Sequence, residues 1–189
     1  TNHHILAGND TTKKFYGIIP IEFSAAMLYF HQKGIVQNLI HNLKYKKHQE
    51  IGTLLGEWYA KDLESVANIK TVSEIIPVPL HKKRLEERGY NQITTFCEAL
   101  SNELKIPYNP NLLYRSRYSK TQTKKDKENR KDITNALFDV HFTEADSNKH
   151  FLLVDDVMTS GATLEACAKA LLKIPNSKVS IVTIAYTQS

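Results

Sequence analysis

Cysteine is scarce in this chain of 189 residues, which contains only Cys97 and Cys167. The two lie far apart and form no CxxC pair, so the sequence predicts neither a disulfide scaffold nor a cysteine-rich metal site. No apolar run approaches the roughly 18 residues that a membrane span needs, and no signal-peptide pattern opens the chain. With two reduced thiols, these absences favour a cytoplasmic protein that has no membrane partner.

An excess of one charge sign is also missing from most of the chain. The formal net charge is +5, and residues 114–135 alone carry eight Lys or Arg against three acids, so the remainder sums to zero. A basic segment on a neutral body argues against a broad nucleic-acid-binding face and favours a local loop that meets an anion. This segment has almost no apolar periodicity, which predicts that it is mobile.

Apolar runs of strand length alternate with segments of helical periodicity. Strands are expected over 21–30, 73–80, 133–140, 150–156 and 178–187, and helices over 34–48, 51–63, 91–104 and 163–174. Strands of continuous Leu, Val and Ile that alternate with helices predict an α/β protein with a mostly parallel sheet covered on both faces. One buried face is expected in the helix over 34–48, formed by Ile35, Leu39, Ile40 and Leu43.

Two acids end the apolar run over 150–156. Asp155 and Asp156 are followed by a loop of hydroxyls and glycine and then by a helical pattern. Ligands of open α/β sheets bind at the carboxyl ends of strands, and the free N–H groups of a helix N-terminus suit a phosphate. Carboxylates would repel a phosphate, but they accept hydrogen bonds from vicinal hydroxyls such as those of a ribose. A sugar phosphate therefore fits both halves of the motif.

A P-loop and a phospho-acceptor receiver domain both conflict with the sequence around the two acids. A P-loop requires GxxxxGK[ST], and no lysine follows Gly161. A receiver domain has its paired aspartates on its first strand, whereas only 33 residues follow Asp156. A plain helix cap preceded by solvent-facing acids, with no binding function, stays open.

The stretch FLLVDDVMTSGATLEA, residues 151–166, resembles the phosphoribosyl pyrophosphate (PRPP) motif of type I phosphoribosyltransferases. The resemblance implies that Asp155 and Asp156 hold the 2′ and 3′ hydroxyls of the ribose and that residues 159–163 wrap its 5′-phosphate. It implies Mg²⁺ as cofactor, bound through PRPP with Asp155 and Asp156 as ligands. The PRPP-binding residues after the two acids are Val157, Met158, Thr159, Ser160, Gly161, Ala162 and Thr163.

A second stretch, IIPVPLHKKRLEERGYNQ (75–92), is similar to the signature of the ComF family of competence-associated phosphoribosyltransferase-like proteins. IHNLKYKKH (40–48), Thr121-Gln122 and the series Arg130, Asn135 and Phe138 fit the same family. The resemblance implies a type I phosphoribosyltransferase fold, a mostly parallel sheet flanked by helices. A small N-terminal hood is expected over 1–72 and a core over 73–189, with a flexible loop at 114–135. Many members carry an N-terminal zinc ribbon; here no cysteine precedes Cys97, so either the ribbon was removed or this branch lacks it.

Cationic residues outside the acidic motif are candidates for binding the pyrophosphate and closing the site. The resemblance puts a pyrophosphate loop after the PVP sequence, with Leu80, His81, Arg84 and Arg88 as its candidates, although a solvated amphipathic turn held by Arg–Glu pairs stays open. In the basic segment the candidates are Arg115, Arg117, Gln122 and Arg130, with Arg117 and Arg130 expected to act in catalysis beside the two aspartates; a merely solvated loop is the alternative. Lys44 to Lys47 fit a helix C-terminus or a phosphate contact.

The resemblance implies an enzyme that transfers a 5-phosphoribosyl group from PRPP to an acceptor and releases pyrophosphate. The alternative is a non-catalytic PRPP-sensing or DNA-uptake module, with the uptake machinery or single-stranded DNA as its partner. Nothing in residues 1–72 indicates a purine, pyrimidine or amide pocket, so the acceptor stays open. The aromatic residues Tyr16, Phe23, Tyr29 and Phe30 fit a homodimer interface as well as they fit a core.

Overall fold

The computed structural model describes residues 1–6, 8–46, 48–116 and 137–188. The strands are β1 (Ser24–Tyr29), β2 (Glu74–Pro77), β3 (Leu113–Arg115), β4 (Phe138–Val140), β5 (His150–Met158) and β6 (Lys178–Tyr186). The α-helices are α1 (Asp10–Lys13), α2 (Ile35–Tyr45), α3 (Glu50–Leu63), α4 (Lys82–Arg88), α5 (Thr94–Leu104) and α7 (Ala162–Leu171), and 3₁₀ turns cover Ala67–Thr71 and Glu144–Asp146. Each strand and helix expected from the sequence therefore overlaps an observed element of the same type.

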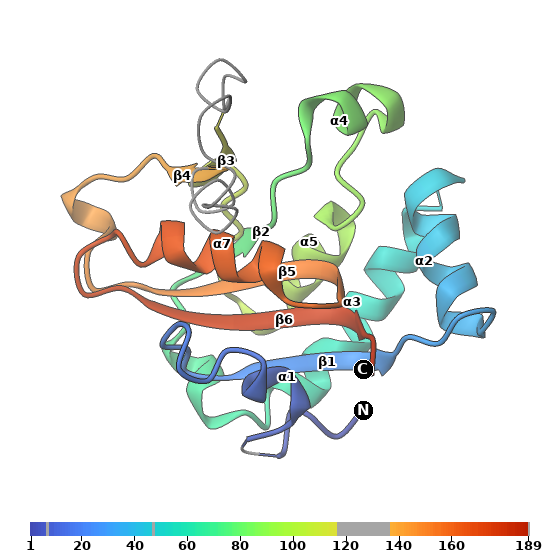
Figure 1. Ribbon diagram of the computed structural model, residues 1–189, viewed down its shortest axis with the longest axis horizontal. Coiled ribbons are helices and arrows are strands. Elements are labelled where there is room, and N and C mark those ends of the chain that lie inside the picture. The colour runs from blue at the N-terminus through green and yellow to red at the C-terminus, as the bar shows by residue number, and fades with distance from the viewer. Residues whose placement is uncertain (7, 47, 117–136, 189) are drawn as a thin grey trace, which may run out of the picture.

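A four-stranded parallel sheet forms the centre of the molecule, in the order β1-β6-β5-β2 (Figure 1). The prediction of a parallel sheet is confirmed. β3 and β4 form a separate antiparallel pair. Residues 24–29 were assigned to the hood by the sequence, yet as β1 they pair with β6 in the main sheet. Where hood and core divide stays a prediction.

Helices cover both faces of the sheet because successive residues of a strand point to opposite sides. On one face Phe151 and Leu153 of β5 are buried with α7 and the β3–β4 pair. On the other face Leu152 and Val154 are buried with α2, α3 and α5. Successive residues of β5 face opposite sides, and both sides are buried. The run of apolar residues in the sequence is therefore continuous. Cys97 and Cys167 are buried free thiols, one in each of these layers.

The contact between α3 and α5 is unusually close at Gly56. A Cβ atom added to Gly56 would lie 2.6 Å from the Cβ of Ala99 and 2.8 Å from the carbonyl oxygen of Phe96, so only glycine fits without movement of one helix. This contact sets the spacing between the two helices. α3 follows α2 directly, and α5 follows α4. The distance between α3 and α5 therefore also affects the distance between α2 and the segment that joins α4 to α5, at the carboxyl edge of the sheet.

The buried face predicted for α2 is only partly correct. Ile40 and Leu43 are buried, but Ile35 is 81% exposed. Ile35 is the first residue of the helix, and the next residue, Val36, packs against the core instead. None of the helices in the described ranges, α2 included, combines the length and apolar character needed to cross a membrane.

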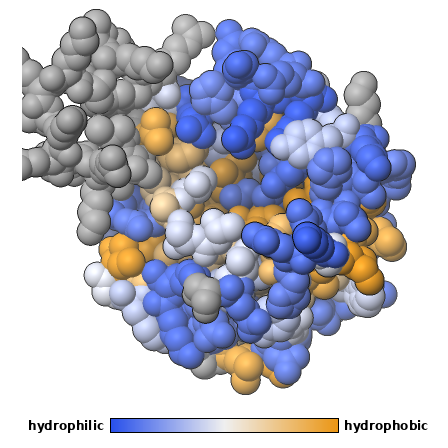
Figure 2. Space-filling view, turned by 45° about the vertical axis from the view of Figure 1, so that its right-hand side comes forward, coloured by the Kyte–Doolittle hydropathy of each residue, from blue (hydrophilic) through white to orange (hydrophobic). Residues whose placement is uncertain are grey.

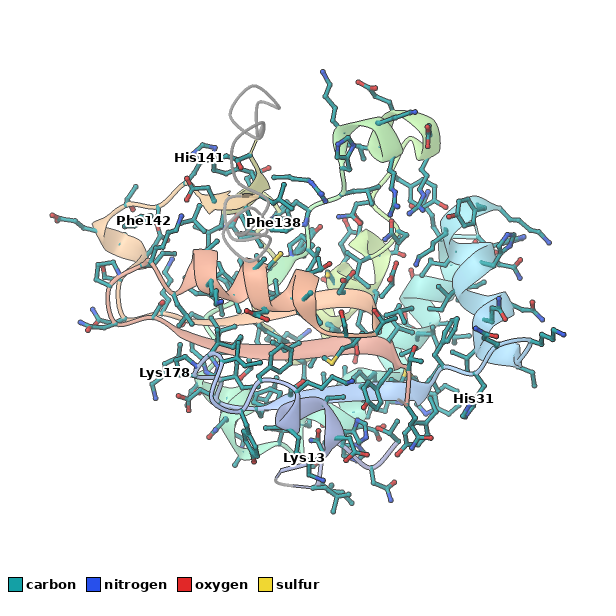
Figure 3. All side chains as sticks on the ribbon, viewed as in Figure 1. Lys13, His31, Phe138, His141, Phe142 and Lys178 are labelled. Carbon is teal, nitrogen blue, oxygen red and sulfur yellow. The ribbon has the colours of Figure 1, made fainter. Side chains whose placement is uncertain are left out.

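The two edges of the parallel sheet lie at opposite ends of the molecule. Figure 3 labels Lys178, where β6 begins, at the amino edge and His31, which follows β1, at the carboxyl edge. Figure 1 shows α2 at this carboxyl edge and α4 standing clear of the sheet. The carboxyl edge is therefore the place where the predicted ligand residues should meet.

Candidate functional site

The sequence predicted that this strand ends at the paired acids, but β5 continues two residues further, to Met158. It continues because its pairing with β6 extends through Val157 and Met158. On the other side β2 stops at Pro77, opposite Val154. Asp155 and Asp156 therefore lie on a strand held on one side only, at the position where its second neighbour has ended.

The carboxylate of Asp156 is bound by two side chains through a single oxygen. Lys44 Nζ lies 2.9 Å from Oδ2, and Gln92 Nε2 donates to the same Oδ2 at 2.7 Å. Asp156 is only 5% exposed. A buried carboxylate that receives an ammonium and an amide donor is held in one orientation.

The carboxyl group of Asp155 is held by the backbone instead. Its Oδ1 accepts a hydrogen bond from the N–H of Asp156 at 2.8 Å. Burial, together with the negative charge of Asp156, raises the pKa of the Asp155 carboxyl to about 8, against the opposing effects of that hydrogen bond and of Lys44. The neutral form of the Asp155 carboxyl is therefore favoured near pH 7 in the protein without ligand.

Among the described residues, each of the two acids has one carboxylate oxygen that receives no protein donor. Within the described part of the chain, no donor reaches Asp155 Oδ2 or Asp156 Oδ1, although the other oxygen of each is bound. Neither free oxygen is among the fully buried atoms that lack a partner. The site thus offers two neighbouring acceptors, which matches the two O–H donors of a vicinal diol.

The loop after β5 turns sharply into α7. Gly161 adopts φ 85°, a left-handed conformation that favours glycine, and it is the N-cap of α7. Gly161 has no side chain to cap this helix end, and the N–H of Ala162 makes only a long contact, 3.4 Å, to Ser160 Oγ. The first turn of α7 lines a small cavity of about 40 Å³ together with Asp155 and residues 157–161. The N–H groups of such a helix start suit a phosphate.

A larger cavity of about 400 Å³ joins the acids to the cationic residues. It is lined by Lys44, Val78, Pro79, Leu80, His81, Arg84, Arg88, Gln92, Arg115, Asp155, Asp156 and Thr163. Asp155 and Thr163 line the small cavity as well. The structure therefore brings together all predicted site residues that it describes, whereas Arg117, Gln122 and Arg130 lie outside the described residues. The roles assigned to these residues stay predictions.

The charges of α4 are paired on one face and unpaired on the other. Lys82 lies 3.7 Å from Glu86, and Lys83 lies 4.0 Å from Glu87. Arg84 and Arg88 follow each other at i, i+4 and line the large cavity, and in the described residues neither forms an ion pair with an acid. Like charges at this spacing destabilise a helix slightly unless an anion lies between them. The expected Arg–Glu pairs are therefore wrong, and the pairs on this solvated helix are Lys–Glu.

Sequence reasoning gave no role to Gln92 and left that of Lys44 open. Gln92 belongs to the GYNQ end of the stretch already singled out, and Lys44 to KYKKH, so each motif was seen. Neither motif shows that the two side chains converge on one atom of Asp156.

The second cavity beside α4, of about 210 Å³, adjoins the large cavity and shares Lys44, Arg84 and Arg88 with it. Its other walls are Tyr45, Glu87 and Tyr90. The Arg88 guanidinium lies 4.8 Å from the centre of the Tyr45 ring. Figure 2 brings the α2 and α4 side forward and shows a surface on which hydrophilic residues predominate.

Comparison with known proteins bears on this geometry. Residues 94–189 match the model of the phosphoribosyl transferase domain. The chain belongs to this family. Its fold is accordingly that of the type I phosphoribosyltransferases, and the matched part contains both aspartates and the loop that follows them.

Relatives within the phosphoribosyl transferase domain family place the chain in its ComF branch. "Competence protein F" of Haemophilus influenzae is 34% identical over 127 residues, covering 64% of this chain and 53% of the relative. "DNA utilization protein YhgH" of Shigella flexneri is 29% identical over 138 residues, covering 71% and 60%. The chain thus spans between half and two thirds of the length of these relatives.

Among solved structures, adenine phosphoribosyltransferase from Leishmania donovani is similar, with a TM-score of 0.46, 12% identity and coverage of 90% of this chain and 85% of that one.

Proposed function

We propose that this ComF-branch phosphoribosyltransferase domain binds PRPP and transfers its 5-phosphoribosyl group to an acceptor, releasing pyrophosphate. The observation that carries the proposal is the pair of free carboxylate oxygens on Asp155 and Asp156. They lie between the N-terminus of α7 and two arginines that pair with no acid among the described residues. Diol acceptors, a phosphate cradle and separate cations are the three needs of PRPP.

In the proposed reaction, the bond between ribose C1 and pyrophosphate breaks, and a bond from C1 to the acceptor's nucleophilic atom forms. Pyrophosphate leaves with the bonding electron pair. The carboxylates orient the ring, the loop holds the 5′-phosphate, and Arg84 and Arg88 stabilise the charge that develops on the leaving group. Such electrostatic stabilisation is stronger where water is excluded from the site.

Magnesium fits this site as a partner of PRPP rather than as an ion held by protein alone. No group of three or more His, Cys, Asp or Glu side chains converges on one point in the described residues. Mg²⁺ commonly takes one or two carboxylates together with phosphate oxygens and water, and the free oxygens of Asp155 and Asp156 are suitable donors. When bound, it would neutralise charge on the pyrophosphate.

The proposal is tested by calorimetry with PRPP, with and without Mg²⁺. Asp155→Asn combined with Asp156→Asn should abolish binding, because amides are poorer acceptors and bring donors toward the diol. Asp10→Asn with Asp62→Asn is the control, since it removes the same charge from α1 and α3. PRPP at about 100 times its dissociation constant should also stabilise the wild-type fold by roughly 2.7 kcal/mol.

Turnover is tested separately from binding. Release of pyrophosphate in a screen of nitrogen and oxygen nucleophiles would establish the transferase and name its acceptor. Undiminished PRPP affinity in the double Asn variant would remove the proposed site. Binding without turnover for any acceptor would favour a PRPP-sensing module.

Handling of single-stranded DNA is the second candidate function. The names of the two relatives refer to competence and to DNA utilization. The second cavity combines Tyr45 and Tyr90 with cations, a pairing that suits stacked bases and phosphates. Neutralising Lys120, Lys124, Lys125 and Lys127 should then weaken a salt-sensitive DNA affinity. Absence of any DNA affinity at low salt would eliminate this candidate.

A further inference from the structure

A closed chain of polar contacts joins the two halves of the carboxyl-edge site. It begins at Asp156 Oδ2, which is bound by Lys44 at 2.9 Å and by Gln92 at 2.7 Å. Gln92 accepts through its Oε1 from Arg88 Nη1 at 2.7 Å. Arg88 Nη2 donates to the Tyr45 hydroxyl at 3.2 Å. Tyr45 is the neighbour of Lys44 in α2, so the chain returns to its start.

The orientation of the Gln92 amide is fixed by the polarity of both its contacts in this series of hydrogen bonds. Its amide NH₂ must face the carboxylate of Asp156, and its carbonyl must face the guanidinium of Arg88, because the reverse arrangement would oppose like groups. Gln92 is only 7% exposed. A buried amide whose two ends are both satisfied holds its neighbours more rigidly than either contact would alone.

Both donors to Asp156 reach the same oxygen, and this decides which oxygen remains for a ligand. With Oδ2 held by Lys44 and Gln92, rotation of the carboxylate would break two contacts at once. Asp156 Oδ1 is thereby kept as the free acceptor at the large cavity. Asp155 needs no such help, since its own carboxylate is fixed by a backbone N–H.

We propose that Lys44 and Gln92 are positioning residues that determine the selectivity of the site for one ribose hydroxyl, acting through Asp156 and linked to the pyrophosphate side through Arg88. This proposal rests on the proposed function, because it presumes that the two acids receive the ribose diol. The substrate class follows as a ribose phosphate with both ring hydroxyls intact. A deoxyribose phosphate would leave an acceptor of the site unpaired.

The test compares ribose 5-phosphate with its 2-deoxy and 3-deoxy analogues by calorimetry. Wild type should prefer ribose 5-phosphate by about tenfold over each analogue, the value of one charge-assisted hydrogen bond. In Lys44→Met and Gln92→Leu, the preference should disappear for one hydroxyl and persist for the other. The hydroxyl that loses selectivity is the one held by Asp156, and the other, held by Asp155, is an internal control.

Isosteric variants separate positioning from folding. Gln92→Glu keeps the acceptor for Arg88 but turns a carboxylate oxygen toward Asp156, so it should lose selectivity as Gln92→Leu does. Lys44→Arg keeps the charge and should recover selectivity in part. Lys61→Met and Gln37→Leu are matched controls on other helix surfaces. Thermal melting of each variant establishes that it is folded.

Three results would overturn the inference or its basis, and they differ from one another. Folded Lys44 and Gln92 variants with wild-type selectivity at both hydroxyls would remove the positioning role. Equal weakening of all three sugars would show that the two residues only support the fold. Failure of the wild type to bind either PRPP or ribose 5-phosphate would refute the proposed function and the inference together.

Discussion

The two ends of β5 carry similar charges but treat them differently. At the amino end, Glu74 receives Lys149 on Oε1 and Asn109 on Oε2, and Lys149 also contacts Asp146 at 2.8 Å. At the carboxyl end, Asp155 and Asp156 each leave one oxygen without a protein donor in the described chain. The first end satisfies its acid within the protein, whereas the second keeps acceptors available. An incomplete set of partners therefore marks the binding end of the strand more clearly than charge does.

His150 extends this contrast at the amino end. Its Nδ1 lies 2.8 Å from Thr71 Oγ1 and its Nε2 lies 2.8 Å from Ser180 Oγ. Burial lowers the pKa of the His150 imidazole. A histidine with both nitrogens occupied and its neutral form favoured is suited to structure rather than to proton transfer.

Among the variants that test this contrast, the largest expected effect comes from removing Arg84 and Arg88, which pair with no acid in the described residues. Arg84→Met with Arg88→Met should weaken binding of PRPP by about 100-fold, because two charge-assisted contacts to pyrophosphate are lost. Loss of the Arg88 contacts to Gln92 and Tyr45 should lower the melting temperature, and relief of the like-charge pair on α4 should offset part of this loss. Calorimetry and thermal melting measure the two effects.

Lys82→Met with Lys83→Met is the matched control for the arginine variant. It removes the same charge from the same helix, but from side chains already paired with Glu86 and Glu87. Its affinity for PRPP should stay near that of wild type. Equal losses in the two double variants would mean that α4 acts only through its general charge, and the contrast between paired and unpaired cations would fail.

A second prediction concerns the amino end of β5. Lys149→Met should lower the free energy of unfolding by about 2 kcal/mol, because it leaves Glu74 and Asp146 without their shared cation. PRPP affinity should not change. Lys173→Met removes a lysine whose own side chain is about half exposed where it pairs with Asp139, so it should cost less than about 1 kcal/mol. Chemical denaturation checks both values, and a loss of PRPP affinity in Lys149→Met would show that the two ends are coupled.

The last expected effect is a dependence of stability on pH at Asp155. Its pKa in the folded protein is raised to about 8, above that of an unfolded chain, so folding favours the protonated form. The stabilisation is complete at pH values below the unfolded pKa and is lost as the pH rises toward 8. Thermal melting should therefore show Asp155→Asn to be more stable than wild type at pH 8 and of similar stability near pH 3.

Asp146→Asn gives the opposite sign and sharpens this comparison. Hydrogen bonds from Lys149 and from the backbone of Thr143 lower the pKa of the Asp146 carboxyl. Its stabilisation is present at neutral pH and is lost as the pH falls through the lowered pKa. The variant should therefore be less stable than wild type at pH 7 and equally stable in strong acid. Melting curves that shift in the same direction for both variants would contradict the assignment of the two ends.

The sequence predicted the elements and the acidic motif because both depend on local patterns. Continuous apolar runs located the strands, and the DD–TSGAT order located the turn into α7. The end of β5 was wrong because two charges were taken to end a strand, whereas pairing with β6 carries the backbone two residues further. Ile35 was misjudged because periodicity defines the face of a helix but not how far along that face the core reaches.

Partnerships across the chain could not be predicted from one sequence. Lys44 and Asp156 meet only because α2 and β5 come together at the same edge of the sheet. The KYKKH motif is equally typical of a helix end that complements its dipole, and α2 does have Lys44 in its last turn. The GYNQ motif carries no signal that its glutamine has a carboxylate on one side and a guanidinium on the other.

Gly56 lines none of the three cavities of the site, yet it limits which substitutions the site can tolerate. α3 and α5 approach each other there with no room for a methyl group, and the segments before those two helices supply Lys44 and Gln92. A larger residue would act as a wedge that moves the lysine and the glutamine apart while every ligand-binding side chain remained unchanged. Such a variant would change no residue that contacts the ligand and would still lose selectivity for the ribose hydroxyls. The alignment of the two halves of the site thus depends on a position that has no side chain.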